Sequence, residues 1–140
     1  GGKLITVYGI GRVCHIAFWE PHLAEGLNER EWRAQTHRLA VPLHPLTMEQ
    51  NSITSFNSNM IEVPAFANSV GPGLFLTSDW CIGGCDGGYP ERGAQWQGQS
   101  VAITLHHGPS RWLPSTYMPT LPGRLFLLSS LLSPLGADLH

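Results

Sequence analysis

The sequence predicts a small α+β domain with an N-terminal β-hairpin, one amphipathic helix and long loops rich in glycine and proline. Three observations lead to this fold class: apolar stretches on both sides of a Gly-x-Gly loop, a helix-capping pattern at Asn28, and 16 glycines and 11 prolines among 140 residues. Long loops count against a compact fold, so partial disorder is an open outcome. Because no linker and no internal repeat divides the chain, residues 1–140 are expected to form a single domain.

The N-terminal stretch, residues 3–19, is the most strand-like part of the chain. Apolar, β-branched and aromatic residues flank Gly9-Ile10-Gly11, a loop whose length favours a hairpin. The same glycines look like the beginning of the dinucleotide fingerprint G-x-G-x-x-G, in which glycine lets the backbone approach a pyrophosphate. Cys14 stands at the third glycine position. The hairpin is therefore the main prediction, and a nucleotide-dependent oxidoreductase is an alternative.

A helix is predicted from about Glu29 to Leu39. Asn28 is a good N-cap, and Glu31, three residues later, completes a capping box. The helix should end before Pro42, because the residue that precedes a proline disfavours helical backbone. Charged residues crowd this segment, which indicates a solvent-exposed helix face.

The remaining elements follow from apolar alternation and from helix- and strand-breaking residues. Residues 50–59 are polar and rich in asparagine and serine, which predicts a loop. Residues 61–66 predict a short strand, and the proline within it restricts that strand to a sheet edge. Residues 79–98 predict a long glycine-rich loop. Ser100–His106 alternates as a strand does, and Leu125–Leu132 is expected to be a buried helix or strand.

Charge and hydropathy argue against two classes of partner. The formal net charge is −2, and the cluster of basic residues Arg30, Arg33 and Arg38 is surrounded by glutamates. A nucleic-acid binder needs several clustered cations against phosphate, so no nucleic acid is expected, and an anionic membrane surface is disfavoured for the same reason. No run approaches the roughly 20 apolar residues of a membrane span.

Two cysteines and two histidines form a candidate metal site. Cys81 and Cys85 are separated by three residues, and His106 and His107 follow further along the chain. Two thiolates and one or two imidazoles can hold zinc tetrahedrally. On the predicted strand the adjacent histidines point to opposite faces, so one of them would bind the metal. Zinc is thus an alternative to the main prediction, which has no cofactor.

The segment Gly84–Pro90, GCDGGYP, resembles the G-C-[ND]-G-G-Y-P segment of the papain-like cysteine peptidases. In that family the segment is structural: its cysteine forms a disulfide, and its glycines form a turn beside the substrate cleft. The family's nucleophile motif C-G-S-C-W is absent here, and no Asn-Ser-Trp follows a downstream histidine. The resemblance implies a degenerate relative and assigns no catalytic residue.

No specific biochemical function follows from these patterns. The main interpretation is a small non-enzymatic interaction or structural protein, and a composition with a single lysine is consistent with a chain without evolved activity. The apolar segment Leu125–Leu132 favours a protein partner or self-association. His15, His22, His37 and His44 are interpreted as scattered surface residues, and a proton- or metal-binding role is the alternative for them. The zinc-binding module and the two kinds of enzyme named above are the alternatives.

Overall fold

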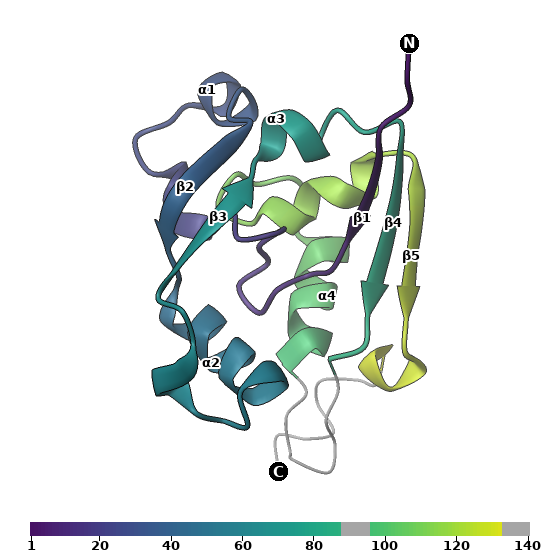
Figure 1. The fold of residues 1–140 in the computed structure, drawn as a ribbon. Helices are drawn as coiled ribbons and strands as arrows, with labels where there is room; N and C mark the ends of the chain where they lie inside the picture. The colour runs from purple at the N-terminus through teal and green to yellow at the C-terminus, as the bar shows by residue number, and fades with distance from the viewer. Residues whose placement is uncertain (88–95, 133–140) are drawn as a thin grey trace.

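The computed structural model describes residues 1–87 and 96–132, which form two small sheets and several short helices (Figure 1). The larger sheet is parallel and has the strand order β1-β4-β5. Its strands are β1 (Ile5–Tyr8), β4 (Trp80–Cys85) and β5 (Gly123–Leu127). The helices and the second sheet lie to one side of this parallel sheet (Figure 1).

The parallel sheet shows that the predicted N-terminal hairpin is wrong. Thr6 of β1 lies opposite Cys81 of β4, far along the chain, and not opposite a residue that follows the glycine loop. β4 lies inside the stretch that was expected to be a glycine-rich loop. A side chain at Gly83 would collide with Tyr8 and Leu125, so glycine is required where the three strands approach. Two of the six residues of β4 are glycines, which have no side chain to contribute to an alternating apolar pattern. The pattern of apolar residues therefore did not predict this strand.

The prediction of a single helix is also wrong. Residues 50–59, expected to be a loop, belong in large part to α2, and Ser100–His106, expected to be a strand, belongs to α4. In α4 the buried positions include Ser100 and Thr104, whose spacing of four residues puts polar side chains on the inner helix face. The helices are α1 (Glu29–Arg33), α2 (Pro45–Ser55), α3 (Pro72–Phe75) and α4 (Trp96–His106), with 3-10 helices at Pro21–Ala24, Met60–Glu62, Pro114–Thr120 and Ser129–Leu132.

Helix α1 begins where the sequence predicts and ends earlier. The capping box is confirmed: Asn28 Oδ1 accepts from Glu31 N at 3.0 Å, and the Glu31 carboxylate accepts from Asn28 N at 2.9 Å. The helix ends at Arg33, and β2 (His37–Pro42) replaces the expected last turns. β2 pairs antiparallel with β3 (Phe66–Val70). A long-range ladder thus outweighs local helix propensity.

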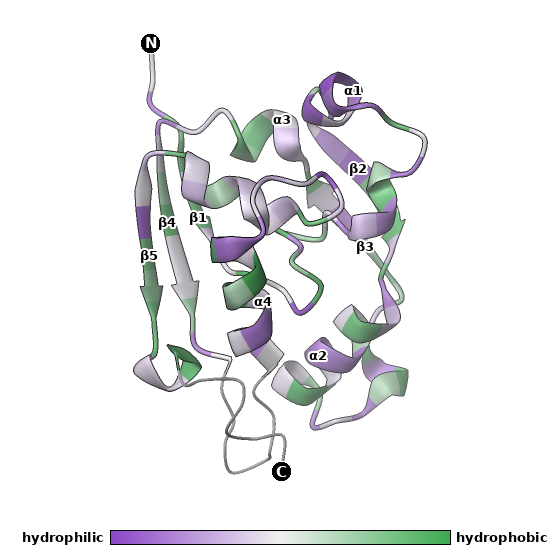
Figure 2. Cartoon of the chain, turned by 180° about the vertical axis from the view of Figure 1, so that it is seen from behind, coloured by the Kyte–Doolittle hydropathy of each residue, from purple (hydrophilic) through white to green (hydrophobic). Residues whose placement is uncertain are grey.

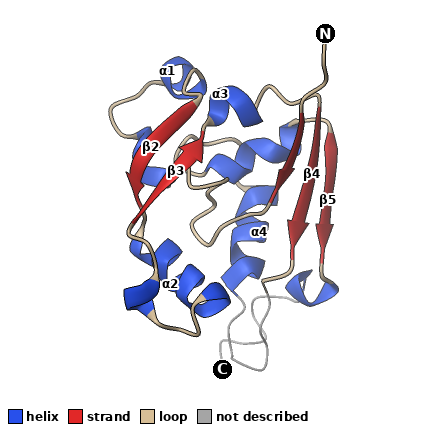
Figure 3. Cartoon of the chain, in the orientation of Figure 1, coloured by secondary structure: helices blue, strands red, loops and turns tan. Residues whose placement is uncertain are grey.

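The core fills the space between the parallel sheet and the helical segments α4 and Pro114–Thr120 (Figure 3), and it continues to buried side chains of α1, α3 and the 3-10 helix Pro21–Ala24. Trp32 of α1 is fully buried and stacks on Tyr117, with 5.0 Å between the ring centroids. Tyr8 packs against both buried clusters. The first cluster contains Ile16, Trp19, Ala24, Trp32, Phe75, Cys81, Tyr117 and Met118, and the second contains Ile10, Cys85, Val101 and Leu131.

The apolar C-terminal segment combines strand and helix. Leu125–Leu132 begins within β5 and continues into the 3-10 helix Ser129–Leu132. Leu131 enters the second core cluster, whereas Phe126 and Leu132 remain exposed. Among the described residues, no helix is both long enough and apolar enough to cross a lipid bilayer.

Candidate functional site

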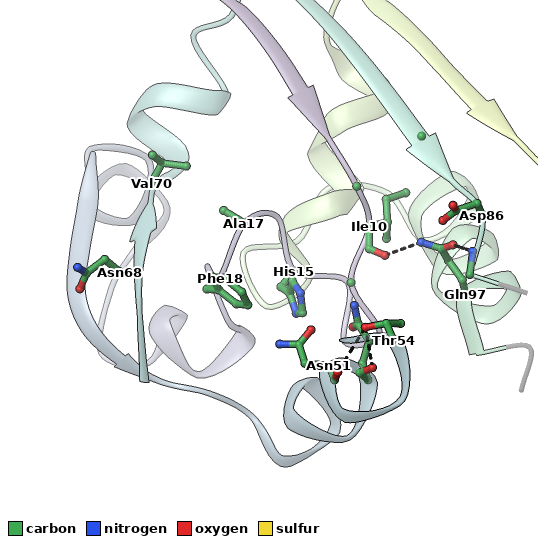
Figure 4. Close-up of a pocket in the computed structure, with 15 residues that line it drawn as sticks. Ile10, His15, Ala17, Phe18, Asn51, Thr54, Asn68, Val70, Asp86 and Gln97 are labelled. Atoms are coloured by element: carbon green, nitrogen blue, oxygen red, sulfur yellow. Dashed lines mark hydrogen bonds between the residues drawn. The ribbon is translucent and has the colours of Figure 1, made fainter. Parts of the chain in front are cut away.

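A cavity of about 600 Å³ lies at the carboxyl ends of β1 and β4 (Figure 4). In open sheets of parallel strands, ligands bind outside the carboxyl ends of the strands. The lining comes from the glycine loop after β1, the turn after β4, the loop around His15, and elements α2, β3 and α4. It comprises Gly9, Ile10, Gly11, His15, Ala17, Phe18, Gln50, Asn51, Thr54, Asn68, Val70, Gly84, Asp86, Gly87 and Gln97.

A buried histidine, a glutamate and a threonine are connected behind the cavity wall. His15 lines the cavity, and only 5% of it is exposed, while Glu20 and Thr47 are fully buried. The Thr47 hydroxyl donates to Glu20 Oε2 at 3.1 Å and lies 3.2 Å from His15 Nδ1. Glu20 Oε2 itself lies 3.5 Å from His15 Nδ1. The three side chains come from the loop after β1, its continuation before Pro21, and helix α2.

For an ionised Glu20 and a neutral His15, the hydrogen bonds assign the imidazole proton to Nδ1. The single hydroxyl hydrogen of Thr47 goes to Glu20, so the Thr47 oxygen accepts from His15 Nδ1–H. Nε2 of His15 then keeps its lone pair. A histidine whose Nδ1–H is fixed by an oxygen acceptor, with a carboxylate nearby, can take a proton at Nε2 and return it.

The loop that carries His15 is held in an uncommon backbone conformation. Cys14 has φ 60° and Ala17 has φ 54°, and few residues other than glycine adopt such values. Gly11 N donates to His15 O at 3.1 Å, and Cys14 N donates to Gly11 O at 2.9 Å. Any Cβ at Gly11 would collide with the His15 imidazole, so Gly11 leaves the space that the ring occupies. Backbone strain of this kind is concentrated at functional sites.

Gln97 of α4 joins the two loops at the edge of the parallel sheet. Its Nε2 donates to Ile10 O at 2.9 Å, and its Oε1 accepts from Gly87 N. The side chain is buried, and a Cβ at Gly87 would collide with it. Gln97 therefore fixes the distance between the loops that follow β1 and β4, as Figure 4 shows.

The opposite wall carries amide and hydroxyl groups. Helix α2 contributes Asn51 and Thr54, and β3 contributes Asn68, whose Oδ1 accepts from Ala40 N of β2 at 3.0 Å (Figure 4). Among the described residues that line the cavity, the titratable side chains are His15 and Asp86, and none is a lysine or an arginine. Amides and hydroxyls provide both donors and acceptors, which suits a ligand with several hydroxyl groups.

The structure places the predicted zinc ligands on two separate elements. Cys81 and Cys85 lie on the same buried face of β4, but four strand residues span about 13 Å. His106 ends α4 and His107 follows it, and both are exposed. Burial raises the pKa of the Cys85 thiol to about 11, which disfavours the thiolate that zinc needs.

Among the described residues, no group of three or more His, Cys, Asp or Glu side chains is placed to hold a metal ion. The zinc site of Cys81, Cys85 and His106 or His107 stays a prediction.

The two other sequence patterns lie beside the cavity. The Gly9–Gly11 loop does follow a parallel strand, but no helix begins directly after it, and the next helical turn starts at Pro21. The helix N-terminus that a dinucleotide-binding loop needs is therefore missing there. In the peptidase-like segment, Cys85 is a buried free thiol, and residues 88–90 lie outside the part of the chain that the structure describes.

Sequence reasoning missed the buried pair His15 and Glu20. His15 was expected at the surface, and the structure buries it. The available signal was a histidine and a glutamate five residues apart directly after a Gly-x-Gly loop. That signal gains meaning once β1 is known to be a strand of a parallel sheet, because the loop then lies at the ligand-binding edge.

No family model matches the sequence, and no curated protein matches it. Among solved structures, the chain is similar to a monomeric glucosamine-6-phosphate deaminase described as a missing link of the NagB superfamily. The fold resembles that of the NagB superfamily. The TM-score is 0.71 at 21% sequence identity, and the match covers 92% of this chain and 46% of the deaminase chain. The chain thus spans less than half of that protein's length.

This likeness corrects two predictions. The fold is a parallel three-stranded sheet with several helices and an antiparallel pair, in place of one helix and a hairpin. The main interpretation, a small non-enzymatic interaction or structural protein, is also wrong. The solved neighbour that shares this fold is an enzyme. Composition misled here, since it reports neither strand order nor the position of a cavity.

Proposed function

We propose that the chain forms part of an enzyme-like site for a phosphorylated amino sugar, with His15 and Glu20 as its acid–base pair. One observation supports this proposal above all. His15 and Glu20, linked through Thr47, lie at the wall of a cavity at the carboxyl ends of two parallel strands. The substrate class is suggested by the structural neighbour, which is a glucosamine-6-phosphate deaminase.

The amide-rich wall is suited to the sugar part of such a substrate. The Asn51 amide can exchange hydrogen bonds with ring or chain hydroxyls, and the Thr54 hydroxyl, which donates to Gln50 O at 3.1 Å, can accept one. The cavity lining within residues 1–87 and 96–132 holds no lysine or arginine, so we assign no residue to the phosphate group. The proposal therefore concerns the sugar and the proton transfer.

The chemistry that this pair can perform is proton transfer. Nε2 of His15 takes a proton from a substrate hydroxyl or carbon acid, and the imidazolium that forms lies beside the Glu20 carboxylate. The same nitrogen returns the proton to another substrate atom, so the pair ends in its starting state. Thr47 holds the ring in position and does not meet the substrate.

The test follows the His15 ring directly. Glucosamine 6-phosphate is titrated into the chain, the His15 imidazole signals are observed by NMR, and ammonia release is measured. We expect the ligand to shift the His15 signals and His15→Gln to reduce any turnover by at least about 100-fold. His37→Gln, at an exposed histidine of β2, is the matched control. Unchanged His15 signals at saturating glucosamine 6-phosphate and glucosamine would overturn the proposal.

A further inference from the structure

One face of the parallel sheet is apolar and uncovered. The strands β1, β4 and β5 direct alternate side chains away from the helices, and most of these side chains are large and hydrophobic. The exceptions are Gly84 and Arg124, and Arg124 lies beside Ile82. The hydrophobic side chains are Ile5, Val7, Trp80, Ile82 and Phe126, with exposures of 58, 76, 43, 37 and 60%. We call these five residues the open face. Figure 2 shows the hydrophobic colour on β1 and on the end of β5, with a hydrophilic segment nearer the start of β5 and no described helix on that side of the sheet.

An uncovered face is unusual for this kind of sheet. Parallel strands are found almost only in sheets with both faces covered, and their side chains are apolar on both sides for that reason. Here α4 and Pro114–Thr120 cover one face only. A contiguous exposed apolar patch on a protein commonly marks an interaction site.

The free edge of β1 adjoins the open face. Within the described residues, β1 pairs with β4 alone, so its outer edge has backbone groups available to a further strand. β1 carries no charge, whereas the other edge strand, β5, exposes Arg124. Charged side chains protect sheet edges against added strands. An additional strand is therefore expected to pair with the edge of β1 more readily than with the edge of β5.

A second copy of this chain stacked on the open face would bury too little surface. Three strands about 4.8 Å apart and about five residues long present a face of roughly 200–250 Å². A stable interface between two proteins buries about 800 Å² on each side. An occupant that also pairs along β1 and extends beyond the sheet reaches that size more readily.

We propose that the open face and the β1 edge form the docking surface for the complementary half of a NagB-type fold. That half would add one parallel strand beside β1 and lay the apolar side of a helix across Val7, Ile82 and Phe126. The match to the solved deaminase supports this occupant, because it covers 46% of that chain and leaves more than half of that chain's length unmatched. The inference depends on the fold and not on the proposed acid–base chemistry.

The test uses the part of the solved deaminase that this chain does not match, co-expressed with residues 1–140. We expect a 1:1 complex in size-exclusion chromatography with light scattering. Val7→Asp should weaken it at least tenfold, because a carboxylate would be buried against apolar side chains. Ile61→Asp, at an exposed isoleucine of the 3-10 helix Met60–Glu62, is the matched control and should leave the complex intact.

Hydrogen exchange on the wild-type chain gives a readout that needs no variant. Amides of Ile5–Tyr8 should gain protection when the complementary half binds, whereas those of β5 should not. Failure to form a complex, or a complex that Val7→Asp leaves unchanged, would overturn the proposal. A dimer of this chain that Val7→Asp abolishes would identify a second copy as the occupant and would overturn it as well.

Discussion

At the scale of single residues, Glu20 is notable as a fully buried carboxylate with hydrogen-bond partners on both oxygens. Oε2 accepts from Thr47 at 3.1 Å, and Oε1 lies 3.5 Å from His44 N. A buried carboxylate without such partners would cost several kcal/mol. An apolar side chain at position 20 would avoid the free-energy cost of burying a carboxylate beside His15. A glutamate at this position is consistent with a chemical role for the pair.

Thr47→Val tests the bridge between these groups. Valine keeps the shape of threonine but leaves Glu20 with one donor fewer and His15 Nδ1–H without its acceptor. We expect the free energy of unfolding to fall by about 1–3 kcal/mol, measured by urea denaturation. Thr47→Ser retains the hydroxyl and should recover most of the loss. Equal stability of the valine variant and the wild type would show that the hydroxyl bridge does not hold the pair.

At the scale of elements, α1 docks on the 3-10 helix Pro114–Thr120 through one tyrosine. Tyr117 stacks on Trp32, and its hydroxyl donates to the Glu29 carboxylate at 2.8 Å. The Arg33 guanidinium lies 4.8 Å from the centre of the same ring. Burial raises the pKa of Tyr117 to about 12, and the Glu29 carboxylate adds to the rise. The contact joins elements that are far apart in the sequence.

The pH dependence of stability should reveal this contact in alkaline solution. Tyr117 has a folded pKa of about 12 against about 10 in an unfolded chain, so its neutral form is favoured by folding. Its contribution is complete below pH 10 and is lost as the pH rises towards 12. Burial likewise raises the pKa of Tyr8 to about 12.

Ultraviolet titration of the phenolate is the measurement for this prediction. Tyr8 and Tyr117 should both titrate near pH 12, and Tyr117→Phe should remove one of these two late steps while Tyr8→Phe removes the other. If both tyrosines ionise near pH 10 in the folded protein, the packing described for them is incorrect.

At the scale of the whole molecule, the two core clusters share one side chain. Tyr8 contacts both clusters, and the parallel sheet passes from one to the other. Shared packing of this kind couples the two parts in unfolding. The prediction that residues 1–140 form a single domain can be tested on this basis.

Urea unfolding followed by tryptophan fluorescence should show one cooperative transition. Its slope should be about 1–3 kcal/mol/M, because the buried surface of a small domain is exposed at once. Two separate transitions would contradict the single domain. Repeating the titration with a chelator tests the zinc prediction at Cys81, Cys85 and His106 or His107: a lower midpoint would support the metal site, and an unchanged midpoint would remove it.

Local sequence determined the start of α1. Asn28 and Glu31 satisfy the first backbone donors of the helix by themselves, so the capping box was predictable from four consecutive residues. The strand character of Ile5–Tyr8 was also present in the sequence. Both features depend on interactions between residues that are close along the chain.

The tertiary structure alone decided the partner of β1, the strand character of Trp80–Cys85 and the meeting of His15 with Thr47. Glycines at β4 hide its alternation, and the β1–β4 ladder joins residues that are 75 positions apart. Parallel strands are joined by a long connection, and the sequence of that connection does not indicate which strand will be the partner. The cavity exists only where these distant segments meet. The sequence therefore determined the local turns and caps, and long-range packing determined the sheet and the candidate site.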